Sequence, residues 1–191
     1  MKRLFYIPIL CLLGVVACMP RLPKIPKSVY YNTFHNAQKQ YRLAELKRLE
    51  SERPGSRMTP AVYKQVYMTA IKKASAVIDL HPTSKWVDDS LLLIGKAFYW
   101  REDYADALTK FQEVQENFPQ SGLITETLYW QGLTLWAAGQ INNARLSLIQ
   151  AGEREGSDLK AQARLSLAEI EVSEENYEGA IDAFRELLDA L

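Results

Sequence analysis

The side chains that most often carry chemistry in proteins are scarce in this sequence. It contains two cysteines, Cys11 and Cys18, and two histidines, His35 and His81. Such small numbers argue against a Cys/His zinc site or a disulfide framework, and neither histidine has a catalytic partner at a typical spacing. His81 is expected in a surface turn, because a proline follows it. Glycine-rich phosphate loops and nucleophile elbows are absent from the sequence. We therefore expect no cofactor, no metal and no enzymatic activity.

Cys18 differs from the other three residues because of what precedes it. Two basic residues come before an apolar run over residues 4–16, as in a secretory signal peptide, and the run is too short for a comfortable membrane span. The segment 15–18, Val-Val-Ala-Cys, resembles the lipobox of bacterial lipoproteins. That resemblance implies that residues 1–17 are removed and that Cys18 carries acyl chains on its sulfur and on its new amino group.

Lipidation would anchor the chain to a membrane. A thiolate is the side-chain nucleophile best suited to accept a lipid group, and several acyl chains hold a protein on a bilayer where one does not. An aspartate after the lipidated cysteine retains lipoproteins of enteric bacteria in the inner membrane, so Met19 favours the periplasmic face of the outer membrane. The alternative is an ordinary signal peptide, or an uncleaved anchor, with an incidental cysteine.

Residues 18–28 are expected to form an extended tether. Pro20, Pro23 and Pro26 recur every three residues with basic residues between them. Proline at this density prevents a helix and favours polyproline-like chain. The basic side chains are suited to contact anionic head groups, and simple solubility of a linker explains them equally well.

Composition and charge limit the classes of protein to which the folded part of the chain can belong. Hydrophobic residues make up 48% of the 191 and charged residues 24%, so the chain is expected to bury a core. Equal numbers of basic and acidic side chains, 23 each, argue against a nucleic-acid binder. Residues 18–80 hold 12 basic and 4 acidic side chains, whereas residues 81–191 hold 9 and 19. We expect the first part to favour anionic lipid and the second to face a basic partner region.

Three segments of the chain repeat one pattern. Their central alanines, Ala107, Ala144 and Ala180, lie 37 and 36 residues apart. A small residue precedes each alanine by twelve positions and a bulky one follows it by four, which are the side chains needed where two helices cross closely. Each unit is therefore predicted to be a helical hairpin that is stable only when stacked on its neighbours. These pairs of small and bulky residues are Gly95 with Phe111, Gly132 with Leu148, and Ala168 with Phe184.

This pattern resembles the tetratricopeptide repeat. The first unit carries the match at Leu91, Ile94, Gly95, Phe98, Ala107, Phe111, Val114 and Pro119. The resemblance implies an all-α fold, a right-handed solenoid of antiparallel hairpins, with repeats at 83–119, 120–156 and 157–191. Residues 29–82 are expected to form an enlarged first hairpin.

Both ends of the predicted array depart from the repeat. The second helix of the first hairpin is expected to begin at Thr59 as N-cap, with Pro60 at its first position. In the third repeat Glu171 takes the place of a bulky apolar residue. Either the chain is a shortened member of its family or its C-terminal end binds something. Five apolar residues there have no following unit: Ile181, Phe184, Leu187, Leu188 and Leu191.

In tetratricopeptide arrays the first helices of the repeats line a concave groove, and the resemblance places two sets of residues there. They are Asp89, Leu92, Lys96, Tyr99 and Trp100 in one repeat, and Glu126, Tyr129, Leu133, Trp136 and Ala137 in the next. Aromatic anchors dominate interface energetics, so this groove is suited to hold a helix or an extended peptide. The alternative is that these aromatics pack between repeats as core, which we also expect of Trp86 and Trp130.

The lipobox, the tether and the hairpins together resemble the BamD family, the lipoprotein subunits of the machine that assembles β-barrels in the bacterial outer membrane. This resemblance implies a scaffold on the periplasmic face that binds partner subunits and unfolded barrel proteins through its groove, and no nucleic acid. The chain is expected to hold about three and a half to four hairpins, whereas that family has five. The alternatives are a pilotin or a coordinator of cell-envelope division and, from another class, an accessory enzyme with a catalytic carboxylate.

Overall fold

The computed structural model describes residues 27–154 and 159–188, and all regular secondary structure within these ranges is helical. This confirms the predicted all-α fold. The predicted signal peptide, Cys18, the tether up to residue 26 and Leu191 lie outside the described residues. The eight helices of the described ranges are α1 (Lys27–Ser51), α2 (Pro60–Leu80), α3 (Val87–Arg101), α4 (Tyr104–Asn117), α5 (Ile124–Ala137), α6 (Ile141–Glu153), α7 (Lys160–Ser173) and α8 (Tyr177–Leu188).

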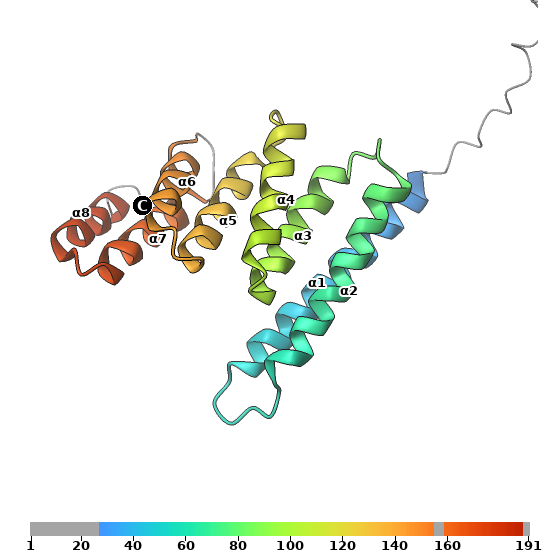
Figure 1. The fold of residues 1–191 in the computed structure, drawn as a ribbon, viewed down its shortest axis with the longest axis horizontal. Coiled ribbons are helices and arrows are strands. Elements are labelled where there is room, and N and C mark those ends of the chain that lie inside the picture. The colour runs from blue at the N-terminus through green and yellow to red at the C-terminus, as the bar shows by residue number, and fades with distance from the viewer. Residues whose placement is uncertain (1–26, 155–158, 189–191) are drawn as a thin grey trace, which may run out of the picture.

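The helices form a row of antiparallel hairpins (Figure 1). Each helix packs against the next one in the chain, and α1, α3, α5 and α7 also contact one another in that order. The odd-numbered helices therefore make one layer and the even-numbered helices the other. The α1–α2 hairpin stands at one end of the row and projects beyond its neighbours because its helices are longer (Figure 1).

The close helix crossings predicted from the repeat are present. A Cβ atom on Gly95 would lie 2.8 Å from Cδ1 of Phe111, and one on Gly132 would lie 2.6 Å from Cγ of Leu148. Both bulky side chains are fully buried. Since real Cβ atoms do not approach other carbons this closely, only glycine lets α3 pack on α4, and α5 on α6, at these separations.

Proline sets several of the helix ends. α2 begins with Pro60 in its first turn and Thr59 as N-cap residue, but the Thr59 side chain makes no capping hydrogen bond. α2 ends at Leu80 and α4 at Asn117, two residues before a proline in each case. This is expected because proline disfavours helical geometry in the residue that precedes it.

The expected surface position of His81 is wrong, because this residue is only 7% exposed. It is the C-cap residue of α2, and its backbone N–H donates to the carbonyl of Val77 at 2.9 Å. The buried residues Ala70, Ala74 and Val77 form a helical stripe, and His81 continues that stripe by one more step of four. The stripe carries the imidazole toward the core although the helix has ended.

Trp86 packs in the core, as predicted. Its ring stacks on that of Phe34, with the ring centroids 5.1 Å apart and an interplanar angle of 18°. Phe34 belongs to α1, whereas Trp86 directly precedes α3, so the stack joins the first hairpin to the second. Tyr41 of α1 and the fully buried Tyr67 of α2 make an edge contact at 5.4 Å in the same cluster.

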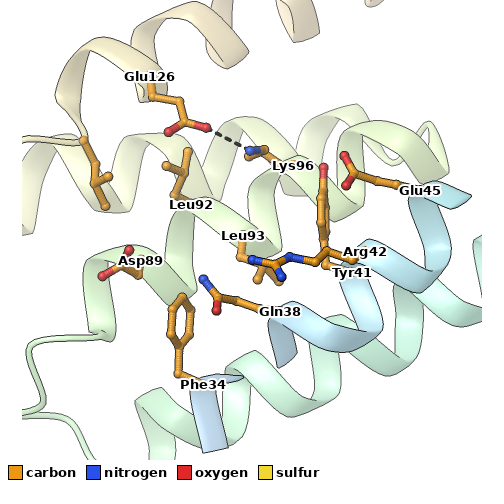
Figure 2. A pocket seen from close by; sticks show the side chains of 11 residues that line it. Phe34, Gln38, Tyr41, Arg42, Glu45, Asp89, Leu92, Leu93, Lys96 and Glu126 are labelled. Carbon is orange, nitrogen blue, oxygen red and sulfur yellow. Dashed lines mark hydrogen bonds and ion pairs between the residues drawn. The ribbon is translucent and has the colours of Figure 1, made fainter. Parts of the chain in front are cut away.

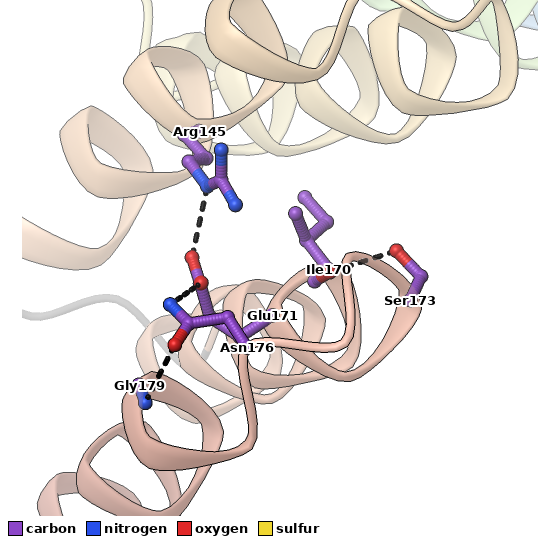
Figure 3. A network of polar contacts seen from close by, with 6 residues as sticks. All are labelled: Arg145, Ile170, Glu171, Ser173, Asn176 and Gly179. Carbon is purple, nitrogen blue, oxygen red and sulfur yellow. Dashed lines mark hydrogen bonds and ion pairs between the residues drawn. The ribbon is translucent and has the colours of Figure 1, made fainter.

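The helix α7 forms although Glu171 replaces a bulky apolar residue (Figure 3). One carboxylate oxygen of Glu171 accepts a hydrogen bond from Arg145 Nε at 2.8 Å, and the other accepts one from Asn176 Nδ2 at 2.6 Å. Oδ1 of Asn176 in turn accepts the backbone N–H of Gly179 at 3.3 Å. A polar network therefore joins α6, α7 and the first turn of α8 where an apolar contact was expected.

The outer face of α8 is apolar and uncovered, as predicted. Ile181 is 51% exposed and Leu188 is 70% exposed. Phe184 holds the repeat position of Phe111 and Leu148, yet it is 37% exposed whereas they are fully buried. This difference in exposure indicates that two neighbours together cover the bulky residue of a repeat: the other helix of its own hairpin and the hairpin that follows.

Candidate binding groove

A cavity of about 280 Å³ lies on the layer of odd-numbered helices, toward the N-terminal end of the row (Figure 2). Three helices contribute to it because the odd-numbered helices lie side by side. The stacking of the first three hairpins thus builds a site that no single hairpin contains. Its lining residues are Phe34, Gln38, Tyr41, Arg42 and Glu45 from α1, Asp89, Leu92, Leu93 and Lys96 from α3, and Leu123 and Glu126 at the start of α5.

Four of the predicted groove residues meet in this cavity: Asp89, Leu92, Lys96 and Glu126. Leu92 is only 5% exposed and packs with Phe111, so it belongs to the apolar floor. Lys96 Nζ donates to Glu126 Oε1 at 2.8 Å, and this ion pair ties α3 to α5 across the cavity (Figure 2).

The α1 side of the cavity was not found by sequence reasoning. A signal for it is nevertheless present: Phe34, Gln38, Tyr41 and Glu45 follow one another at steps of four, three and four residues. The same steps of four and three separate the predicted groove positions of α3. Treating α1 as the first helix of a repeat, and not only as half of an enlarged hairpin, would have placed these four residues in the groove.

Charge in the cavity is mixed. Asp89 is half-buried, and its burial together with the neighbouring carboxylates of Asp88 and Glu126 raises its pKa to about 6, against a smaller opposing effect of Lys85. Arg42 is exposed at the opposite wall, on α1. A ligand in the cavity therefore meets charges of both signs on each side: Asp89, Glu126 and Lys96 from α3 and α5, and Arg42 and Glu45 from α1, with leucines beneath them.

The predicted groove aromatics pack against one another. The ring of Tyr99 lies 4.9 Å from that of Trp100 and 5.4 Å from that of Trp130, and Trp130 also lies 6.0 Å from Tyr129. These rings come from α3 and α5, so they form a contact between neighbouring hairpins. Edge-to-face geometry at these distances is favourable for aromatic pairs. The packing predicted for Trp130 is confirmed.

The other predicted positions on α5 lie further along the helix. Trp136 is half-buried against the cluster that joins α5 to its neighbours, Leu133 is half-buried, and Ala137 is exposed. None of these three lines the cavity. The predicted row of groove residues is therefore divided between a cavity at the α1 side and a packed aromatic contact beside it.

Two cations hold the wall of the cavity in place. Lys96 Nζ lies 5.0 Å from the centre of the Trp130 ring and 5.6 Å from that of Tyr41. The guanidinium of Arg48 lies 3.7 Å from the centre of the Trp100 ring. Cation–π contacts of this kind stabilise a fixed arrangement. They join α1, α3 and α5, the same three helices that line the cavity.

Nothing in residues 27–154 and 159–188 points to a metal site, because no three His, Cys, Asp or Glu side chains are grouped there to hold an ion. Among the same residues, no helix is long and apolar enough to cross a bilayer. What the described cavity offers is a surface of mixed charge over an apolar floor.

A protein-family model matches most of the folded part of the chain. The model of a family described as YfiO, outer membrane lipoprotein, covers residues 56–186, which is more than half of the chain. The chain belongs to this family of outer-membrane lipoproteins. The match confirms the resemblance to the BamD family. No curated protein matches the chain.

The YfiO match begins in the loop between α1 and α2 and ends within α8. It therefore includes α3 and α5, which carry the acidic side of the cavity. The α1 side, with Gln38 and Arg42, lies before the matched range. The cavity is thus built jointly from the family region and from the preceding helix.

Proposed function

We propose that this YfiO-family protein is a lipid-anchored scaffold on the periplasmic face of the outer membrane. It holds proteins of β-barrel assembly, either partner subunits or unfolded barrel chains, in the cavity between α1, α3 and α5. The main support for the proposal is the cavity, which combines an apolar floor with charged side chains of both signs. The chain that holds it belongs to a family of outer-membrane lipoproteins. The protein acts by binding, and the proposal needs no bond-making step.

The size of the cavity favours a polypeptide ligand. Its volume of about 280 Å³ lies just below the range of about 300–1,000 Å³ that is usual for small-molecule sites. That space fits one or two side chains of a longer chain. Leu92 and Leu93 offer apolar contact to such side chains, while Asp89 and Arg42 lie at opposite sides to pair with polar groups of the peptide.

The anchor places this cavity where barrel proteins are assembled. Acyl chains on Cys18 and a proline-rich tether would hold the hairpins close to the periplasmic surface of the membrane. The affinity of a weak peptide site rises when tethering increases the local concentration of its ligand. A shallow cavity can therefore serve a scaffold whose partners share the same membrane.

Site-specific photocrosslinking in cells tests this function. A photoreactive residue replaces Gln38 in the cavity and, as a matched control, Gln150, which is exposed on α6 in the other layer. We expect the position 38 chain to form adducts that mass spectrometry identifies as β-barrel assembly subunits or barrel polypeptides. The position 150 chain should form none. The absence of such adducts at position 38, or equal adducts at both positions, would contradict the proposal.

A second arm separates the cavity from the aromatic contact. The substitutions Tyr99→Ala and Trp136→Ala are introduced into the chain that carries the crosslinker at position 38. Because these rings pack between helices, circular dichroism first checks that the array remains folded. Persisting adducts assign binding to the cavity alone, whereas specific loss of adducts from a folded chain extends the binding surface to the aromatic row.

A further inference from the structure

The outer face of α1 carries a row of exposed leucines. Leu43, Leu46 and Leu49 are 40%, 64% and 50% exposed. Within the described residues α1 contacts only α2 and α3, and it does so through the opposite face, which holds the buried Ala37 and Ala44. Single exposed leucines are common on protein surfaces, but three within two helical turns make a continuous apolar strip.

Cations border this strip. A shallow hollow of about 370 Å³ beside the leucines is lined by His35, Lys39, Gln40, Arg42, Leu43 and Leu46. Lys39 and Arg42 are exposed, and neither forms an ion pair with another described residue. The acidic groups at the end of α1 are already paired, Glu52 with Arg48 at 2.6 Å and Glu50 with Arg53 at 2.7 Å. The strip is therefore apolar with a positive border.

From this arrangement we propose that the outer face of α1 lies against an anionic phospholipid bilayer, the membrane to which the chain is anchored. Leucines with flanking lysine and arginine are typical of helices that lie in a membrane interface, where aliphatic groups enter the acyl boundary and cations meet phosphates. The long side chains of Lys39 and Arg42 can reach the head groups while Leu43 and Leu46 point inward.

A bilayer fits this face better than a protein partner does. Binding sites for proteins are usually organised around tryptophan, tyrosine or arginine anchors that fill pockets. The exposed apolar side chains of the strip are all leucines beside a shallow hollow, and no tryptophan, tyrosine or phenylalanine is among the residues that line that hollow. Such a surface suits a fluid apolar phase that needs no shape complementarity.

The length of the tether allows this contact. Lys27, the first residue of α1, follows Cys18 by nine positions along the chain, a distance of at most about 30 Å. Leu43 lies 16 residues further along α1, about 24 Å from its start. The anchor therefore keeps the whole strip within reach of the bilayer when α1 lies flat on it. The inference rests on lipidation of Cys18 as proposed above, and among the described residues Arg42 is the one that lines both the cavity and the hollow beside the strip.

Spin labelling of the lipidated full chain tests this contact. The sequence has no cysteine other than Cys11 and Cys18, so Leu46→Cys introduces the one free thiol of the mature lipoprotein. Leu146→Cys is the matched control, since Leu146 is 60% exposed on α6. Each labelled chain is reconstituted in vesicles of phosphatidylcholine alone and of phosphatidylcholine mixed with phosphatidylglycerol. Collision with oxygen and with a water-soluble nickel chelate measures the depth of each label.

We expect the label at position 46 to be shielded from nickel and exposed to oxygen in the anionic vesicles only, and the label at 146 to stay aqueous in both. Adding Lys39→Ala and Arg42→Ala should lower the ratio of docked to undocked chain by about 30-fold. Lys160→Ala, an exposed lysine on α7, should leave it unchanged.

An aqueous label at position 46 on a chain that sediments with the vesicles would overturn the docking and leave the lipid anchor intact. A chain that sediments with neither vesicle would overturn the anchor and the docking together. Shielding of position 46 that depends on an added protein, and not on phosphatidylglycerol, would make this face a protein interface and overturn the proposal as well.

Discussion

Replacing Gly95 by alanine should weaken the array at its central crossing. The added Cβ would lie 2.8 Å from Cδ1 and 2.9 Å from Cζ of the Phe111 ring, and closer still to Cε1. The ring is fully buried, so it has no free volume into which to turn. Relief requires α3 and α4 to move apart, and that movement would also disturb Leu92, which packs on the same ring and forms part of the cavity floor.

Two opposing effects set the magnitude. Overpacking of a well-filled core costs about 1–3 kcal/mol. Alanine is a better helix former than glycine by about 1 kcal/mol, and Gly95 lies inside α3, so this gain offsets part of the cost. Because the added Cβ lies under 3 Å from atoms of a fully buried ring, the overpacking cost should fall in the upper part of this range, about 2–3 kcal/mol, and we expect the free energy of unfolding to fall by about 1–2 kcal/mol. Gly132→Ala should behave similarly, because its Cβ would lie 2.6 Å from Cγ of the buried Leu148.

Urea unfolding followed by circular dichroism measures this loss. Gly122→Ala is the matched control, since a Cβ there meets no atom within 4 Å. Phe111→Leu provides a rescue test: the smaller side chain should make Gly95→Ala less costly than it is in the wild type, as a double-mutant cycle measures directly. Unchanged stability of Gly95→Ala, or a cost that Phe111→Leu does not alter, would refute the conclusion that this glycine sets the helix separation.

Two further predictions concern the charges of the cavity. Burial, Asp88 and Glu126 raise the pKa of Asp89 to about 6, so its ionisation destabilises the fold. The contribution of Asp89 to stability should be greatest below about pH 4 and should fall by about 1 kcal/mol, after allowance for solvent screening, as pH rises from 4 through 6. Asp89→Asn should remove that loss in urea titrations at several pH values, and an unchanged pH profile would contradict it. The ion pair of Lys96 and Glu126 can be measured by a double-mutant cycle with Lys96→Met and Glu126→Gln. We expect a coupling free energy of about 0.5–1 kcal/mol that decreases as the salt concentration rises. A coupling of zero at low salt would show that the 2.8 Å contact does not stabilise the protein.

The close helix crossings that were predicted correctly have a short sequence separation. Gly95 meets Phe111 and Gly132 meets Leu148 sixteen residues later, within one hairpin. Such contacts depend only on helical periodicity and on one turn between two helices, and the side-chain sizes along the chain report both. The apolar face of α8 follows in the same way, because within the described residues no further hairpin packs on its outer stripe.

Two residues, His81 and Glu171, have surroundings that differ from those their sequence context suggested. His81 looked like a turn residue because of the proline after it, but the buried stripe of α2 extends through it. Glu171 looked like a weakness of α7, but Arg145 of α6 and Asn176, in the turn between α7 and α8, donate hydrogen bonds to its carboxylate. The first outcome is decided by the stripe of α2, which continues past the end of the helix, and the second by an arginine of the preceding hairpin together with an asparagine from the turn after α7.

By itself the sequence determined that this protein is a series of helical hairpins behind a lipobox-like segment, because hairpin formation and signal recognition are read from residues close together in the chain. Only the tertiary structure decided which side chains share a site. Gln38, Asp89 and Glu126 meet because three hairpins stack with a particular rotation between them. That rotation is set by contacts between repeats, such as the stack of Phe34 on Trp86, whose partners lie far apart in the sequence.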